Sequence, residues 1–284
     1  MKNEPPRRTS EHRPRLTRRG RLVLIVSAAV AVATAVLVPL LTVLSAEPPA
    51  EEKKTVSLLV PEGRRATQVY ASVDKVLDVS PGTTAKAATA ARLELPDDAR
   101  RNPEGYLFPA TYPVEAGATP AGLLGYMVDT ARERFAADRV TAGARRNGVS
   151  VYETVTIASI LQAEADTPAD MSRVSRVVHN RLARNMPLQM DSTLNYALNR
   201  STLDTTHSET KTASPYNTYE FKGLPPTPIG NPGEEAMNAA INPAKGDWLY
   251  FVTVAPGDTR FTADYAEHQR NVEEFNANRS AATG

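Results

Sequence analysis

The position of Glu164 is the hardest in this chain to explain by folding alone. It ends a stretch in which Ile157, Ile160 and Leu161 recur at the spacing of a buried helix face, and Glu164 is the next member of that series. A buried carboxylate without a partner is costly, so such a group is either paired or keeps its proton through a raised pKa. A glutamic acid protonated at neutral pH can act as a general acid. The pattern therefore predicts either a catalytic acid or a structural glutamate paired with an arginine.

The flanks of Glu164 indicate the elements that position it. Ser150 and Glu153 have the spacing of a capping box, which predicts a helix start at this point. Thr167 and Pro168 predict the start of the next helix, with a buried stripe formed by Met171, Val174, Val178 and Leu182. Further helices are expected at 67–77, 84–93, 119–146, 233–241 and 264–277, and strands at 56–60, 248–254 and 261–262. The fold class predicted is α+β and rich in helices.

The N-terminal residues predict a membrane anchor. Residues 1–21 carry eight basic side chains and two acidic ones, and 22–46 contain no charged residue. About 20 apolar residues suffice to cross a bilayer, so we expect a basic cytoplasmic tail at 1–21, a single transmembrane helix at 22–46 and a linker at 47–55. The positive-inside rule then places the rest of the chain outside the cell membrane. The alternative is a cleaved signal peptide, which the length of the apolar run and Leu44-Ser45-Ala46 fit poorly.

Composition excludes several classes of chemistry. Beyond residue 21 there are 25 basic and 30 acidic residues, an excess of negative charge that argues against nucleic acid as the main partner. The chain has no cysteine, and its four histidines lack the spacing of a metal site. It also lacks a glycine-rich phosphate loop and a Gly-x-Ser-x-Gly motif. We therefore expect no metal and no cofactor, and chemistry that depends on carboxylates.

Several collinear segments between residues 56 and 275 resemble the YceG-like family, the MltG endolytic murein transglycosylases. The segments are Glu-Gly-Tyr-Leu-Phe-Pro-Ala-Thr-Tyr (104–112), Ala-Ser-Ile-Leu-Gln-Ala-Glu (158–164), Leu-Gln-Met-Asp-Ser-Thr (188–193), Ser-Pro-Tyr-Asn-Thr-Tyr (214–219), Gly-Leu-Pro-Pro-Thr-Pro-Ile (223–229) and Ala-Glu-His-Gln-Arg-Asn-Val (266–272). The resemblance implies a small, abbreviated LysM-like α/β subdomain at 56–113 and a lysozyme-like catalytic domain with a short β-sheet at 114–284. It also implies that Glu164 is the catalytic residue. This chain has Gln162 where the family usually has a first glutamate, and Ala165 where it has a threonine or serine.

Seven further residues are candidates for substrate binding, each with a structural alternative. Gln189, Asp191 and Thr193 follow a helix end and could bind sugar or N-acetyl groups, although Asp191 could instead cap the next helix. Tyr216, Asn217 and Tyr219 could line a glycan cleft or form a rigid packing loop. Glu104 could lie near the cleft or bind a backbone group.

The resemblance implies a membrane-anchored enzyme that cuts nascent peptidoglycan strands internally. A lytic transglycosylase of this kind cleaves the bond between N-acetylmuramic acid and N-acetylglucosamine and leaves a 1,6-anhydro end, with one glutamate as acid and then base. Its expected partners are peptidoglycan strands and, by resemblance, penicillin-binding synthases. Two alternatives stay open: a hydrolase with Asp191 as the second carboxylate, and a non-catalytic peptidoglycan-binding scaffold of the synthesis machinery.

Overall fold

A computed structural model describes residues 56–200 and 206–283. The predicted tail at 1–21, transmembrane helix at 22–46 and linker at 47–55 lie outside these ranges. Within them, no helix is long and apolar enough to cross a membrane. The described residues belong to a single compact unit, and its mixture of helices with small sheets confirms the α+β class.

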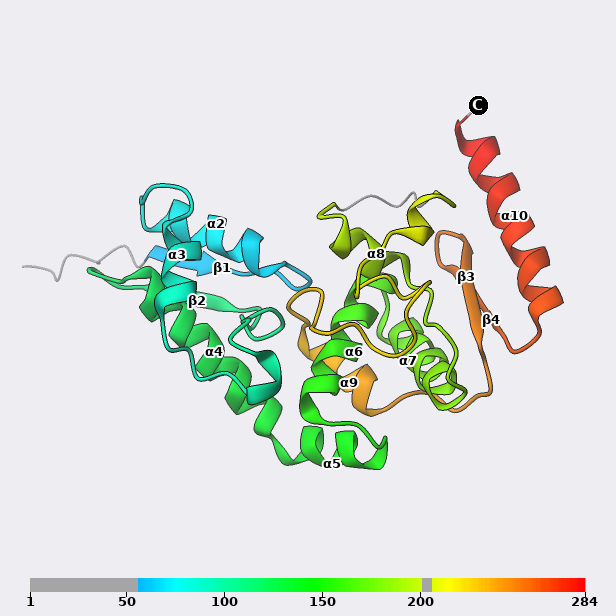
Figure 1. Cartoon of the computed structure of the whole chain (residues 1–284), viewed down its shortest axis with the longest axis horizontal. Helices are drawn as coiled ribbons and strands as arrows, with labels where there is room; N and C mark the ends of the chain where they lie inside the picture. Colours follow the sequence, from blue (N-terminus) through cyan, green and yellow to red (C-terminus); the bar gives the residue numbers. More distant parts are fainter. Residues whose placement is uncertain (1–55, 201–205, 284) are drawn as a thin grey trace, which may run out of the picture. The chain divides into compact units, whose positions relative to one another are not determined.

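The N-terminal part combines a two-stranded sheet with three helices (Figure 1). The strands are antiparallel, with Val56 opposite Val114, so the sheet closes one residue beyond the predicted boundary at 113. The last helix of this part packs on the two before it. It therefore completes the core of the small subdomain that was predicted to end before it. The elements are β1 (Val56–Leu59), α2 (Ala66–Val76), α3 (Thr83–Ala90), the 3₁₀ turn η1 (Asp97–Ala99), β2 (Thr111–Val114) and α4 (Pro120–Ala136).

The predicted long helix at 119–146 is wrong, because the chain forms two helices there. Thr119 caps α4 as expected, accepting a hydrogen bond from the Gly122 N–H at 3.1 Å. Ala137 then adopts an extended conformation, and α5 (Asp138–Arg146) starts in a new direction. The break brings Gly143 of α5 into close contact with the side chain of Ile241. Neither proline nor glycine marks the break, and the partner of Gly143 is distant in sequence.

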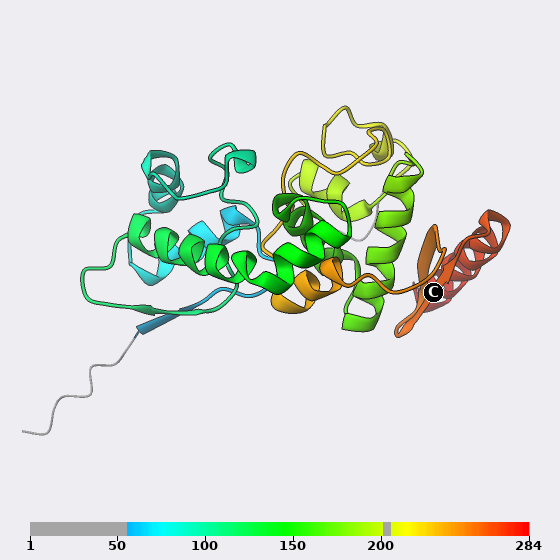
Figure 2. The same ribbon diagram turned by 90° about the horizontal axis from the view of Figure 1, so that it is seen from below.

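Helix α6 (Val151–Glu164) lies at the centre of the larger helical part (Figures 1 and 2). The capping box is confirmed: Ser150 Oγ accepts from the Glu153 N–H at 3.1 Å, and the Ser150 N–H donates to Glu153 at 2.7 Å. Residues 154–161 are buried on every side, not only on the predicted apolar face. The helices that contact α6 are α5, α7 (Pro168–Ala183), α8 (Asp191–Ala197) and α9 (Glu234–Ile241). Glu164 is thus presented at the end of a helix fixed along its length.

The C-terminal residues form a hairpin and a long helix. Strands β3 (Tyr250–Ala255) and β4 (Asp258–Thr262) pair antiparallel, as predicted, with Tyr250 opposite Thr262. Helix α10 (Tyr265–Thr283) packs along this hairpin, and β3 also contacts α7. A 3₁₀ turn, η2 (Glu209–Lys211), precedes the proline-rich loops. The hairpin connects α10 to the helical core.

Glu104 joins the N-terminal part to helix α8. Its side chain is only 3 % exposed. One carboxyl oxygen accepts from the Ala66 N–H at the start of α2 at 2.8 Å, and the other accepts from the Tyr196 hydroxyl of α8 at 3.0 Å. The backbone-binding alternative for Glu104 therefore holds. Burial raises the pKa of this carboxyl to about 7, against the smaller lowering effects of these bonds and of Arg65.

We expect Glu104→Gln to change how stability depends on pH. Because the folded pKa lies above the ordinary value of 4.5, the contribution of Glu104 to stability is fully present below pH 4.5 and is lost as pH rises through 7. The loss is about 3 kcal/mol for a shift of this size. Urea unfolding from pH 4.5 to 8 should show a shallower decline for Glu104→Gln than for the wild type, with exposed Glu235→Gln as the control. If the free energy of unfolding fell equally with pH in the wild type and in Glu104→Gln, the raised pKa of Glu104 would be contradicted.

Candidate active site

The carboxylate of Glu164 faces the first turn of α8. Glu164 is half-buried, and its Oε1 accepts two hydrogen bonds from Ser192, one from the backbone N–H at 3.1 Å and one from the hydroxyl at 2.5 Å. Among the described residues, no basic side chain forms an ion pair with it. The structural alternative, a glutamate paired with an arginine, therefore finds no partner among the described residues.

The surroundings of Glu164 favour its protonated form. Burial raises the pKa of the carboxyl, and the nearby charge of Asp191 raises it further, whereas the two bonds from Ser192 lower it. Burial is the largest of these effects, so the pKa lies above its ordinary value. Since Oε1 already accepts two bonds and Oε2 has no partner among the described residues, Oε2 is the oxygen that can carry the proton and exchange it with a substrate.

Two of the predicted residues are joined beside Glu164. The Tyr219 hydroxyl donates to Asp191 Oδ1 at 2.6 Å. Asp191 does not cap α8, because the N-cap position is occupied by Met190. The backbone N–H of Ser192 in the first turn, which has no acceptor within the helix, donates instead to Glu164. A side chain from a different helix thus replaces the local cap that the sequence suggested.

Glu164, Gln189, Asp191 and Tyr219 line one cleft of about 940 Å³. Gln189 is exposed there in a left-handed conformation, with φ of 54°, and its Oε1 accepts from the guanidinium of Arg181 at 3.1 Å. The remaining lining comes largely from β3 and α10. The cleft therefore combines an acid able to hold a proton with the amide of Gln189, the hydroxyl of Tyr219 and a second carboxylate from Asp191, a lining that suits a polar ligand.

The other four candidates for substrate binding lie in the framework. Thr193 is fully buried, and its hydroxyl bonds the Met190 carbonyl and the Thr218 hydroxyl. Asn217 is equally buried, and its amide donates to the carbonyls of Thr210 and Thr212. The hydroxyl of Tyr216 pairs with Thr227 at 2.8 Å. With Glu104, these residues shape the loops around the cleft but do not line it.

Ser192 is the residue that sequence reasoning missed. It lies between the candidates Asp191 and Thr193, but nothing local indicates that its hydroxyl bonds a residue 28 positions away. It supplies a hydroxyl at the acid although Ala165 lacks one. Gln162 accepts from the Gly233 N–H at the start of α9 at 3.0 Å and does not line the cleft. Ala165 does not line the cleft either.

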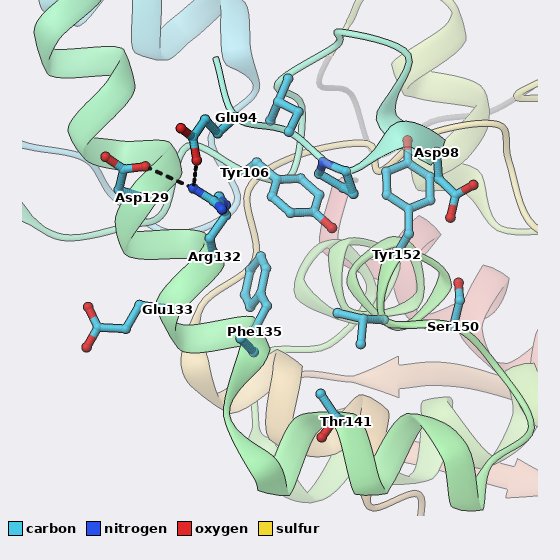
Figure 3. Close-up of a pocket in the computed structure, with 14 residues that line it drawn as sticks. Glu94, Asp98, Tyr106, Asp129, Arg132, Glu133, Phe135, Thr141, Ser150 and Tyr152 are labelled. Atoms are coloured by element: carbon cyan, nitrogen blue, oxygen red, sulfur yellow. Dashed lines mark hydrogen bonds and ion pairs between the residues drawn. The ribbon is translucent and has the colours of Figure 1, made fainter. Parts of the chain in front are cut away.

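A larger cavity, of about 1080 Å³, lies at the opposite end of α6 (Figure 3). Tyr106, Phe135 and Tyr152 form its aromatic lining, and Arg132 is held at its edge by Glu94 and Asp129. None of the residues predicted for the site lines it. The smaller cleft is the better candidate because it contains the raised-pKa acid, so chemistry and not volume identifies the site.

Comparison with known proteins relates the chain to one family. Residues 37–274 match the sequence model of the YceG-like family. The endolytic murein transglycosylase of Bacillus subtilis (strain 168) is 36% identical over 173 residues, covering 61% of this chain and 48% of that protein. The Streptococcus pneumoniae serotype 2 protein (strain D39 / NCTC 7466) of the same name is 35% identical over 182 residues, covering 62% and 33%. The match thus spans half or less of these relatives. The crystal structure of a putative yceG-like protein from Listeria monocytogenes aligns with a TM-score of 0.64 at 31% identity, over 76% of this chain and 75% of that one.

Proposed function

Because the chain belongs to the YceG-like family, we propose that it is an endolytic peptidoglycan transglycosylase with Glu164 as its catalytic residue. The observation that carries the proposal is the state of Glu164: a raised pKa, one oxygen held by Ser192 and the other free in the cleft. The names of the related proteins supply the substrate class, murein. The geometry supplies the acid.

The reaction needs one carboxyl group in two roles. Glu164 donates the proton on Oε2 to the glycosidic oxygen, and the bond from C1 of N-acetylmuramic acid to that oxygen breaks as an oxocarbenium-like centre develops. The resulting carboxylate takes the proton from the C6 hydroxyl of the same sugar, whose oxygen then bonds to C1. The product is a 1,6-anhydro end, and no water is consumed. The Ser192 bonds hold Oε1 and stabilise the carboxylate between the two steps.

Asp191 and Tyr219 have supporting roles in this proposal. The charge of Asp191 favours the protonated form of Glu164, which the first step requires. The hydroxyl of Tyr219 holds Asp191 in place at 2.6 Å. If Asp191 instead activated water or attacked C1, the protein would be a hydrolase. The products distinguish the two reactions.

We also propose that the enzyme acts outside the cell membrane, anchored by residues 22–46, on nascent strands made by penicillin-binding synthases. The uncharged length of 22–46 and the basic residues before it support the anchor and its orientation. Alkaline extraction of membranes, followed by protease accessibility in intact and lysed cells, tests both. A chain released by alkaline extraction, or protected from protease in intact spheroplasts, would contradict the anchor or its orientation.

Product analysis tests the activity. The full chain is incubated with uncrosslinked peptidoglycan, and the fragments are weighed by mass spectrometry. Fragments lighter by one water than hydrolysis products are the expected result. Ordinary reducing ends would indicate a hydrolase, and glycan binding without cleavage by the folded protein would favour a scaffold.

Ser192→Ala should shift the pH profile of cleavage. Loss of the hydroxyl removes a bond that lowers the pKa of Glu164, so the alkaline limb of kcat, where the acid loses its proton, should move to higher pH. The rate at the optimum should fall about tenfold, because one charge-assisted hydrogen bond to the carboxylate is lost. Ser192→Thr keeps a hydroxyl, so the alkaline limb of its kcat profile should lie at the same pH as in the wild type. An unchanged limb in Ser192→Ala would show that this bond does not tune the acid.

A further inference from the structure

The cleft continues well beyond Glu164 along a wall built by β3 and α10. Tyr250, Phe251, Val252 and Thr253 of β3 contribute to it, together with residues of α10 from Tyr265 to Asn276. These residues follow Glu164 by roughly a hundred positions, and none was predicted to belong to the site. We call the β3 and α10 lining residues the distal wall.

Tyr250 fixes the distal wall to the acid side of the cleft. The His268 imidazole stacks on its ring with centroids 5.0 Å apart, and the Arg181 guanidinium lies 5.2 Å from the ring centroid. Arg181 is itself buried, donating to the carbonyls of Leu249 and Leu188 and to the side chain of Gln189. A ligand bound along the wall would therefore be held in a fixed register with Glu164.

Two rings mark the length of the distal wall. Tyr265 begins α10; its ring lies 5.4 Å from that of Tyr250, and 56 % of the residue is exposed. Phe275, half-buried, lines the cleft ten residues later, a rise of about 15 Å along a helix. Gln269 and Asn276 provide amide groups on the same helix and in the same cleft. The wall thus extends along about 15 Å of α10, and it combines aromatic rings and amide groups with the carboxylate of Glu273.

We propose that the distal wall binds sugar units remote from the scissile bond and so makes the enzyme cut strands internally. This inference rests on the proposed function and extends it by naming the residues that select long strands. Sugar rings present apolar C–H faces and hydroxyl edges, which match aromatic rings and amides. Binding energy from such remote units is gained equally in the ground state and in the transition state, so its loss should raise KM and leave kcat unchanged. Short oligomers cannot reach both the acid and the end of the wall.

The experiment separates binding from turnover. In the full chain carrying Glu164→Gln, which binds without cleaving, we measure Kd for short glycan oligomers and for long uncrosslinked strands, with and without Tyr265→Ala or Phe275→Ala. Each ring removed should weaken binding of long strands about five- to tenfold and leave short oligomers unchanged. In the active chain, KM for long strands should rise by the same factor at constant kcat.

Two variants serve as controls. Tyr265→Phe keeps the ring and should bind long strands as the wild type does. Tyr126→Ala removes a ring on α4 that is 51 % exposed and lies outside the cleft, and it is the matched control.

The possible outcomes are distinct. Weaker binding of long strands alone, with products shifted toward chain ends, supports the distal wall as the length-selecting surface. Equal affinities for long strands in Tyr265→Ala, Phe275→Ala and Tyr126→Ala would overturn it even if the enzyme is active. An equal loss of affinity for short and long substrates would also overturn the proposal, because the two rings would then contact the reacting sugar. Failure of the proposed function is separate, since it appears as absence of cleavage by the unmodified chain.

Discussion

Glu164→Gln should reduce the rate of peptidoglycan cleavage by at least about a thousandfold, since general acid–base catalysis by one group contributes 10²–10⁴ and here one group serves both steps. The amide keeps the shape of the side chain and an oxygen that can still accept from Ser192. It has no proton of suitable acidity. The fold should be unaffected, because the change replaces a half-buried acid of raised pKa with a neutral group.

Asp191→Asn is the matched control for Glu164→Gln. Asp191 lines the same cleft and bonds Tyr219, but in the proposed mechanism it only raises the pKa of Glu164. The rate should fall by about tenfold or less, and the alkaline limb of the profile should move to lower pH because one effect that raises the pKa is lost. Equal, near-complete losses in both variants would contradict a mechanism with a single catalytic carboxyl group.

Gly105→Ala should lower the free energy of unfolding much more than a glycine substitution at an open turn. Gly105 has φ of +85°, and a Cβ at this position would lie 2.5 Å from Pro228 Cγ and 3.1 Å from Val155 Cγ1. Overpacking of this kind costs about 1–3 kcal/mol, and the left-handed backbone adds about 1 kcal/mol. A total near 3 kcal/mol should lower Tm by about 6–12 °C in a domain of this size.

Gly117→Ala controls for the backbone part of this effect. Gly117 has nearly the same conformation, with φ of +82°, but no atom of a described residue beyond its two chain neighbours lies within 4 Å of the added Cβ. Its Tm should fall by only a few degrees, in calorimetry on both variants under the same conditions. Equal shifts in the two variants would mean that contact with Pro228 and Val155 does not determine the need for glycine at 105.

The sequence predicted the elements whose signals are local. The capping box at Ser150 and the hairpin around 256–258 depend on residues a few positions apart, and both are confirmed. The prediction of one helix over 119–146 failed at Ala137, where the chain turns before Gly143 packs against Ile241, a residue distant in sequence. Local patterns carry no information on such a partner.

The same distinction separates the residues of the site. A carboxylate within an apolar series was sufficient to single out Glu164, and Gln189, Asp191 and Tyr219 lie with it in the cleft. Their roles in binding stay predictions. Asn217 and Thr193 were selected by residue type, but type does not reveal whether an amide or hydroxyl bonds a backbone carbonyl or faces solvent. Ser192 was missed for the converse reason, since its partner is distant in sequence.

Cleavage in water enriched in heavy oxygen tests the central claim most directly. If Glu164 alone acts as acid and then base and the C6 hydroxyl attacks C1, the new ends contain only oxygen from the strand. Mass spectrometry should then find no label in the cleaved products of the full chain. One heavy oxygen at C1 of each new reducing end, formed in step with cleavage, would contradict the account and assign the reaction to a hydrolase with a second carboxylate.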